Sequence, residues 1–195
     1  RATPQWFISM ESHKLRKKAL KAIDETTFYP SKGKERLKSM IETRPDWCVS
    51  RQRVWGVPLP IFVNKKTKEI LVDDDVFETI AKIYEKEGSD CWFSDDPQKF
   101  LGKKYKSEDF EKLSDIVEVW FDSGSTHSFV LEKRKDLKWP ASMYLEGSDQ
   151  HRGWFHSSLL QSCGTRGKAP FESILSHGFV VDGKGLKMSK SLGNV

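Results

Sequence analysis

The sequence is poor in cysteine and has no long hydrophobic run. Its three cysteines, Cys48, Cys91 and Cys163, are far apart and odd in number, and no CxxC pair occurs. A disulfide framework is therefore not expected, and the pattern is typical of a chain in a reducing, cytoplasmic setting. No apolar stretch could span a bilayer and no signal peptide is present, so we expect no membrane association. The histidines form neither HxxxH nor HExxH, and we predict no metal site and no zinc.

The charge of the chain is unevenly distributed. The 195 residues carry a net charge of +5 and suffice for one domain or slightly more. Residues 13–38 hold nine Lys/Arg against three Asp/Glu, whereas residues 69–118 hold seven against fifteen. A basic segment of this kind is typical either of a nucleic-acid-binding face or of a solvated helix face, and charge alone leaves both open.

The first two thirds of the chain predict short, mixed elements. Apolar spacing predicts helices at residues 13–23, 33–43 and 76–87 and short strands at 6–8 and 70–72. Pro45 and Gly88 are expected to end the second and third helices. Residues 89–115 are polar and predict a region rich in loops.

The last third predicts a β-α-β unit. "ASMYLEGSDQ" indicates a strand that ends at Glu146 and Gly147, followed by a helix over residues 151–163, capped by Ser148 or Asp149 and ended by Gly164. "SILSHGFVVDGKG" indicates a second strand that runs into a glycine-rich loop. Short connections of this kind predict a parallel sheet, and ligands bind beyond the carboxyl ends of such strands.

The final segment, "DGKGLKMSKSLGNV", places Lys187 and Lys190 on a loop between glycines. Two ammonium groups on such a loop suit a polyphosphate whose charge shifts during reaction. The GxxxxGK[ST] spacing of a Walker loop is absent. A solvated basic turn is the alternative, and the lysines alone do not decide between them.

Polar and aromatic side chains meet in "YLEGSDQHRGWF". Gln150 and Trp154 are four residues apart and are expected to share a helix face. In "VEVWFDSGS", Trp120 is expected at the end of a further strand. Two tryptophans at adjacent strand ends would line a slot for an aliphatic side chain. An N-capping aspartate and core tryptophans are the alternative reading.

Taken together and in this order, the motifs resemble one family. "LKMSKSLGN" resembles the KMSKS signature of class I aminoacyl-tRNA synthetases. "RPDWCVSRQRVWGVPLP", "VWFDSGSTHSF", "YLEGSDQHRGWFHSSLL" and "HGFVVDGKGLKMSKS" resemble isoleucyl-tRNA synthetases of the bacterial type, and "EGSDQHRGW" is the discriminating stretch. The resemblance covers essentially the whole chain.

The resemblance implies a reaction and its partners. This family activates isoleucine with ATP and Mg2+ and transfers the product to the terminal adenosine of its tRNA(Ile). It implies an α/β fold: residues 113–195 would be the second half of a Rossmann-type catalytic domain, after an α/β connective-peptide region at residues 1–112. The upstream HIGH motif is absent, so we expect an internal fragment of a monomeric parent. ATP–pyrophosphate exchange by the fragment alone would contradict the expectation that it is inactive.

The resemblance also implies residue roles. The candidates for binding the ATP phosphates are the KMSKS residues Lys187, Met188, Ser189, Lys190 and Ser191, with the two lysines catalytic. The aminoacyl-adenylate contacts would come from Glu146, Gly147, Asp149 and Gln150. The walls of the isoleucine pocket would be Trp120 and Trp154. The adenine side would be His177, Gly178, Phe179 and Val180.

Two alternatives stay open at this point. A valyl- or leucyl-type synthetase would keep the chemistry and change the pocket. A tRNA-binding paralogue without catalysis would depend on the basic residues 14–38 instead, and would show salt-dependent tRNA binding without adenylate binding.

Overall fold

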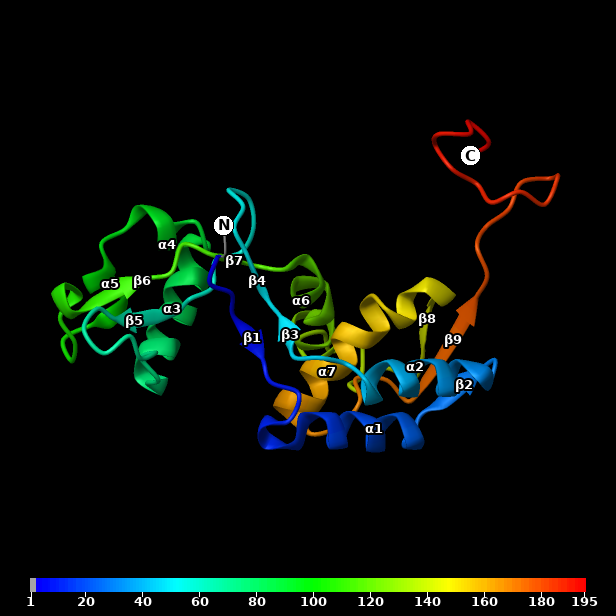
Figure 1. Ribbon diagram of the computed structural model, residues 1–195, viewed down its shortest axis with the longest axis horizontal. Coiled ribbons are helices and arrows are strands. Elements are labelled where there is room, and N and C mark those ends of the chain that lie inside the picture. The colour runs from blue at the N-terminus through cyan, green and yellow to red at the C-terminus, as the bar shows by residue number, and fades with distance from the viewer. Residues whose placement is uncertain (1–2) are drawn as a thin grey trace. The chain divides into compact units, whose positions relative to one another are not determined.

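The computed structural model describes residues 3–195 and divides into two compact units (Figure 1). Unit 1 comprises residues 3–7 and Cys48–Val119, and unit 2 comprises Ile8–Trp47 and Trp120–Val195. The short strands β1 (Phe7–Ile8) and β3 (Trp47–Cys48) lie where the chain passes between the units. Each unit is therefore built from two separate stretches of sequence.

Unit 2 is a mixed α/β structure around a parallel sheet. Its principal elements are α1 (Leu15–Glu25), β2 (Thr27–Tyr29), α2 (Lys32–Glu42), β8 (Tyr144–Gly147), α7 (Trp154–Arg166) and β9 (Ser173–His177). Short helical segments precede or connect them: η1 (Ser12–Lys14), α6 (Val119–Gly124), η3 (His127–Leu131) and η4 (Ser148–His151).

The sheet has the strand order β2-β9-β8, and both pairings are parallel. Gly147 aligns with His177, so β8 and β9 end at the same edge of the sheet. Helix α7 connects these two strands, which confirms the predicted β-α-β unit. Helix α1 packs against α2 and α7, and the apolar residues at these contacts are fully buried, among them Ile23, Leu37 and Leu159.

The helix that follows β8 begins and ends later than the sequence suggested. The prediction of a helix over residues 151–163 is wrong at both ends, since α7 begins at Trp154 and continues to Arg166. Gly164 lies inside the helix, and Gly167, with φ at +78°, ends it instead. Neither Ser148 nor Asp149 caps α7, because residues Ser148–His151 form the separate helical turn η4.

Unit 1 has its own small core. Its elements are β4 (Ser50–Arg51), β5 (Phe62–Asn64), α3 (Asp74–Glu87), α4 (Cys91–Ser94), α5 (Pro97–Leu101), η2 (Ser107–Asp109), β6 (Phe110–Lys112) and β7 (Ile116–Val117). Strands β5 and β6 pair antiparallel, as do β4 and β7. The predicted strand at residues 70–72 is absent, and only Ile70 forms an isolated bridge, to Val63.

The prediction of a loop-rich region at residues 89–115 misses the core of unit 1. Trp92 is 1% exposed and contacts Phe62 and Phe100 at ring-centroid distances of 5.0 and 5.1 Å. Its indole N–H donates to the carbonyl of Leu113 at 2.8 Å. Apolar residues are sparse here, but Cys91, Trp92, Phe100 and Leu101 are buried, so a small number of contacts, several of them aromatic, holds the unit together.

Helix α3 begins with a charged cap. Asp73 accepts hydrogen bonds from the main-chain N–H groups of Asp75 and Val76, which is the N-cap arrangement. Hydrogen bonds from Lys104, and then from Tyr105, lower the pKa of Asp73 to about 2. The start of α3 is thereby tied to the loop that follows α5.

The division at residue 112 between a connective-peptide region and a catalytic half-domain stays a prediction. In space, β2 from the first part of the chain pairs with β9 from the last part. Within residues 3–195, no helix is long and apolar enough to cross a membrane.

Candidate active site

The candidate adenylate-binding residues gather at the carboxyl ends of β8 and β9. Glu146 and Gly147 end β8, and His177 ends β9. A Cβ atom added to Gly147 would lie 2.6 Å from Oδ1 of Asp149 and 3.9 Å from the His177 ring. The glycine thus lets a carboxylate and an imidazole approach the same strand end. This cluster lies at the edge of the sheet where ligands of parallel α/β folds bind.

The carboxylates of this cluster have different local partners. Glu146 is exposed, and its Oε1 accepts a hydrogen bond from the main-chain N–H of Gly147 at 2.9 Å. Asp149 is also exposed and accepts from Nε2 of Gln150 at 3.2 Å. Each carboxylate keeps further lone pairs directed to solvent and could accept bonds from ribose hydroxyl or ammonium groups.

Gln150 lies in η4, before helix α7, and so does not share a face of that helix with Trp154. Its Oε1 accepts from the main-chain N–H of Trp154 at 2.9 Å, while its Nε2 donates to Asp149. One side chain therefore links the carboxylate cluster to the first turn of α7. The expectation that Gln150 and Trp154 lie on one helical face is corrected, because Gln150 precedes the helix in η4.

Trp154 is fixed in place by its neighbours. Its ring stacks on Tyr144 of β8 with centroids 4.0 Å apart and planes 6° apart, and its N–H donates to the carbonyl of Ser123 at 3.1 Å. The hydroxyl of Tyr144 in turn lies 3.1 Å from that of Ser158 on α7. Such a stacked, hydrogen-bonded indole provides a rigid apolar wall.

Trp120 lies close to Trp154 but not at a strand end. The predicted strand stops at Val117, and Trp120 belongs to the helical turn α6. Gly124 makes this turn possible, since a Cβ atom there would lie 2.9 Å from the main chain of Ser157 on α7. The Trp120 ring packs against Gly153. A Cβ atom added to Gly153 would lie 2.8 Å from Cη2 of Trp120, so only glycine leaves room for the ring. The two tryptophans are thus close together at the start of α7, as expected, but Trp120 comes from a helical turn and not from a strand end.

The segment after β9 folds back on itself. Val181 forms a bridge with Lys187, and the N–H of Met188 donates to the carbonyl of Val180 at 3.0 Å. The ammonium of Lys187 lies 3.7 Å from the centroid of the Phe179 ring, a cation–π contact. Residues predicted for the adenine side are therefore joined to the lysine loop, which extends from the end of β9 (Figure 1).

Lys187 and Lys190 are both exposed. Within residues 3–195, neither lysine contacts Glu146 or Asp149 through a hydrogen bond or an ion pair. Ser189 and Ser191 have their hydroxyl oxygens 3.2 Å apart. The carboxylate cluster lies at the end of β8, and the lysine loop follows the end of β9, its neighbour in the sheet. Each makes its own set of contacts.

Two residues that sequence reasoning missed hold the lysine loop together. Oδ1 of Asp182 accepts from the N–H groups of Lys184 and Leu186 at 2.9 and 3.0 Å, and its Oδ2 accepts from Nδ2 of Asn194 at 2.7 Å. Oδ1 of Asn194 accepts from the N–H of Ser189 at 2.9 Å. The Asn194 bond is the main cause of a lowered pKa at Asp182. The Asp-Gly pair at residues 182–183 is a common turn signal, and it could have indicated from the sequence that Asp182 organises a turn.

Replacing Asp182 with alanine is expected to loosen this loop. The change removes three accepted hydrogen bonds, each worth about 1 kcal/mol. Cleavage by trypsin after Lys184, Lys187 and Lys190, followed by mass spectrometry of the released peptides, should accelerate about tenfold or more. The control is Leu192→Ala, because that side chain is exposed in the same loop. Equal cleavage rates in the two variants would contradict a bracing role for Asp182.

No group of three or more His, Cys, Asp or Glu side chains within the described residues is arranged to hold a metal ion. The three cysteines are free thiols. Burial raises the pKa of the Cys163 thiol to about 12, so this thiol is protonated at neutral pH and unsuited to nucleophilic chemistry.

Comparison with known proteins places this geometry in a family. The model of the tRNA synthetases class I (I, L, M and V) matches residues 1–195, which is the whole chain. The chain belongs to the class I tRNA synthetase family. In this family the observed parallel sheet is that of the Rossmann-type catalytic domain.

Individual relatives point in the same direction. This class I synthetase chain is 86% identical over 195 residues to the isoleucine–tRNA ligase of Pelagibacter ubique and 54% identical over 204 aligned residues to that of Zymomonas mobilis. Both alignments cover all of this chain and 22% of the relative, so the chain spans about a fifth of the length of these curated relatives.

A solved structure supports the fold. Methionyl-tRNA synthetase of Mycobacterium tuberculosis, bound by methionyl-adenylate, aligns with a TM-score of 0.52 over 98% of this chain and 29% of its own. The sequence identity is 17%, and the likeness therefore concerns the class I synthetase fold alone.

Proposed function

We propose that the protein containing this chain is an isoleucine–tRNA ligase. It would activate isoleucine with ATP to give isoleucyl-adenylate and pyrophosphate, then transfer the acyl group to the 3' terminal adenosine of tRNA(Ile). The observation that supports this most is the cluster of Gly147, Asp149 and His177 at one sheet edge, followed by the lysine loop. The isoleucine–tRNA ligases that match this chain along its whole length supply the amino-acid specificity.

Each part of the site has a proposed role in activation. Glu146 and Asp149 would accept bonds from the ammonium and ribose groups of the adenylate, and Gly147 would let it approach the strand end. Gln150 would orient Asp149. The adenine would lie along the segment His177–Val180. Lys187 and Lys190 would hold the phosphates of the ATP–Mg2+ substrate, with Met188, Ser189 and Ser191 shaping that loop.

The chemistry needs positioning more than proton transfer. An oxygen of the isoleucine carboxylate attacks the α-phosphorus, a new P–O bond forms, and the bond to the departing pyrophosphate breaks with its electron pair on the leaving oxygen. The carboxylate is already the nucleophile, so no side chain has to act as a base. Two ammonium groups beside the phosphates stabilise the charge that develops on them.

The tryptophans would determine which amino acids enter. Trp154, stacked on Tyr144, and Trp120, against Gly153, would form the walls of a slot for the isoleucine side chain. Such a slot excludes larger side chains but distinguishes valine, one methylene smaller, by only about 1–3 kcal/mol. Misactivation of valine is therefore an expected property of the enzyme.

The setting of the enzyme follows from the same proposal. Its macromolecular partner would be tRNA(Ile), and we propose that it acts in the cytoplasm as a monomer. The free state of all three cysteines is compatible with a reducing compartment.

The test is amino-acid-dependent ATP–pyrophosphate exchange by the full-length protein, with isoleucine, valine, leucine and methionine in parallel. We expect strong exchange with isoleucine and roughly 10- to 200-fold lower kcat/KM with valine. A preference for leucine or methionine would keep the chemistry and refute the assignment of Trp120 and Trp154. Absence of exchange with all four, together with salt-dependent tRNA binding, would favour a tRNA-binding paralogue.

A further inference from the structure

Tyr144 lies behind the tryptophan that would form one wall of the isoleucine slot. The rings of Tyr144 and Trp154 stack with centroids 4.0 Å apart and planes 6° apart. Tyr144 is 3% exposed, whereas Trp154 is only partly buried. The accessible part of the stacked pair therefore belongs to Trp154, and the position of the buried Tyr144 ring determines how far the indole projects.

The Tyr144 ring is itself held by two further contacts. Phe171 packs against it with centroids 4.9 Å apart and planes 59° apart. Its hydroxyl lies 3.1 Å from that of Ser158, a fully buried residue of α7, so one of these hydroxyls donates to the other. Because Trp154 and Ser158 are four residues apart, they lie on the same face of α7. Tyr144 thus contacts that face of the helix at both positions, through its ring and through its hydroxyl.

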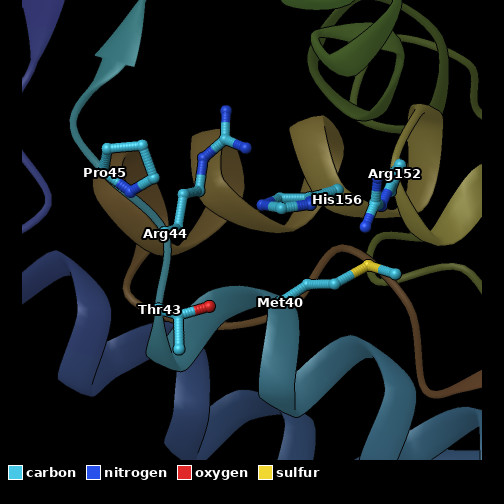
Figure 2. A pocket seen from close by; sticks show the side chains of 6 residues that line it. All are labelled: Met40, Thr43, Arg44, Pro45, Arg152 and His156. Atoms are coloured by element: carbon cyan, nitrogen blue, oxygen red, sulfur yellow. The ribbon is translucent and has the colours of Figure 1, made fainter.

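The other side of the first turn of α7 is loosely packed. Trp154 and His156 are two residues apart, which is about 200° around the helix, so they face nearly opposite ways. Figure 2 shows the His156 imidazole projecting between the side chains of Arg44 and Arg152 in a cavity of about 320 Å³. The cavity is lined by Met40, Thr43, Arg44, Pro45, Arg152 and His156. Because packing is incomplete on this side, the contacts on the side of β8 are the ones that fix Trp154.

We propose that Tyr144 is a specificity-determining residue of the isoleucine slot, which acts by positioning the indole of Trp154. The inference rests on the proposed function and on the assignment of Trp154 to the wall of the slot. A ring stacked at 4.0 Å leaves no gap behind the indole, so the width of the slot is fixed. Isoleucine has one methylene more than valine, and this group keeps its contact only while the wall stays in place.

Replacing Tyr144 with leucine removes the stacked ring and the hydroxyl together. The space that opens behind the indole lets Trp154 tilt away from the slot, and isoleucine loses its extra contact. In ATP–pyrophosphate exchange by the full-length protein, the ratio of kcat/KM for isoleucine to that for valine should fall about fivefold or more. The change should appear mainly as a higher KM for isoleucine, because binding that is uniform between substrate and transition state is lost.

Two further changes at the same position separate the ring from the hydroxyl. Tyr144→Phe keeps the stack and loses only the bond to Ser158, and it should hold the isoleucine-to-valine ratio within about twofold of the wild-type value. Tyr144→Met is measured in parallel, since its flexible side chain fills much of the space but cannot replace the flat ring. It should lower the ratio as Tyr144→Leu does, and it provides a second reading if the leucine variant folds poorly.

Phe28→Leu is the matched control, because it removes a buried aromatic ring from the same sheet. Phe28 and Tyr144 both align with Ile174, so the three residues form one row across β2, β9 and β8. Phe28 is 7% exposed and, within residues 3–195, has no ring contact with Trp154. A smaller folded fraction lowers the rates with both amino acids equally and cancels in the ratio. This control should therefore change the ratio less than about twofold.

A lower ratio in the leucine and methionine variants, with wild-type ratios in Tyr144→Phe and Phe28→Leu, would support the positioning role. An unchanged ratio in Tyr144→Leu and Tyr144→Met, or an equal fall in Phe28→Leu, would overturn it. The proposed function would survive that result, because the wild-type protein would still prefer isoleucine. A wild-type preference for another amino acid would refute the proposed function and this inference with it.

Discussion

Replacing Lys190 with alanine in the full-length protein will lower the rate of isoleucine activation by about 100- to 1,000-fold, a loss typical when one group that stabilises transition-state charge is removed. Lys190 is exposed on the loop that follows β9, and its ammonium is available for an incoming polyanion. The effect should fall mainly on kcat in ATP–pyrophosphate exchange, because the charge on the phosphates changes most in the transition state.

Lys184→Ala is the matched control for this experiment. Lys184 is an exposed lysine in the same loop but lies outside the KMSKS residues. Its loss should change kcat less than about threefold, as expected for a single screened surface charge. If the two variants lose activity equally, the loop acts through its overall charge, and the specific role of Lys190 is wrong.

Replacing Trp92 with alanine will destabilise unit 1 by about 3–5 kcal/mol, the usual cost of truncating a buried aromatic side chain. The variant loses ring contacts with Phe62, Tyr84 and Phe100 as well as the hydrogen bond to the carbonyl of Leu113. Hydrogen exchange measured by mass spectrometry should show protection of the amides of α3 and α5 falling more than about 100-fold.

Phe93→Ala provides the comparison, since Phe93 is the next residue and is 46% exposed. It should shift the same amides by less than about 1 kcal/mol. Similar loss of protection in both variants would mean that the aromatic cluster around Trp92 is not what stabilises unit 1.

The helices and the β-α-β unit could be predicted because their signals are local. Leu37 and Ile41 recur at helical spacing and are fully buried in α2, and the short apolar run around Tyr144 marks β8 directly. The sequence also indicated the strand ends at Gly147 and His177, and the parallel register brings them together. The spacing of apolar residues within a short window was sufficient to predict these elements, because it depends on neighbouring residues alone.

The features that were missed depend on contacts between distant residues. Trp120 was expected at a strand end, but the absence of a Cβ at Gly124 lets this segment coil against Ser157 of α7. The N-cap of α7 is Gly153, and the first main-chain N–H of the helix, that of Trp154, donates instead to the side-chain oxygen of Gln150, three residues before the cap. The hydrogen bond between Asp182 and Asn194 in the lysine loop joins residues twelve positions apart. Neither the helical nor the strand periodicity of the sequence indicates such a pair.

The pairing of β2 with β9 has a consequence for synthesis on the ribosome. Thr27 aligns with Ser173, so β2 leaves the exit tunnel 146 residues before its parallel neighbour. At a translation rate of about 5–20 residues per second, that interval lasts on the order of 10 s. For that time α1, β2 and α2 exist as a nascent segment in which Phe28 of β2 lacks its partner strand. The intervening residues 48–119 emerge in full before that strand does. The order of translation thus favours completion of the inserted unit before the unit that surrounds it in sequence.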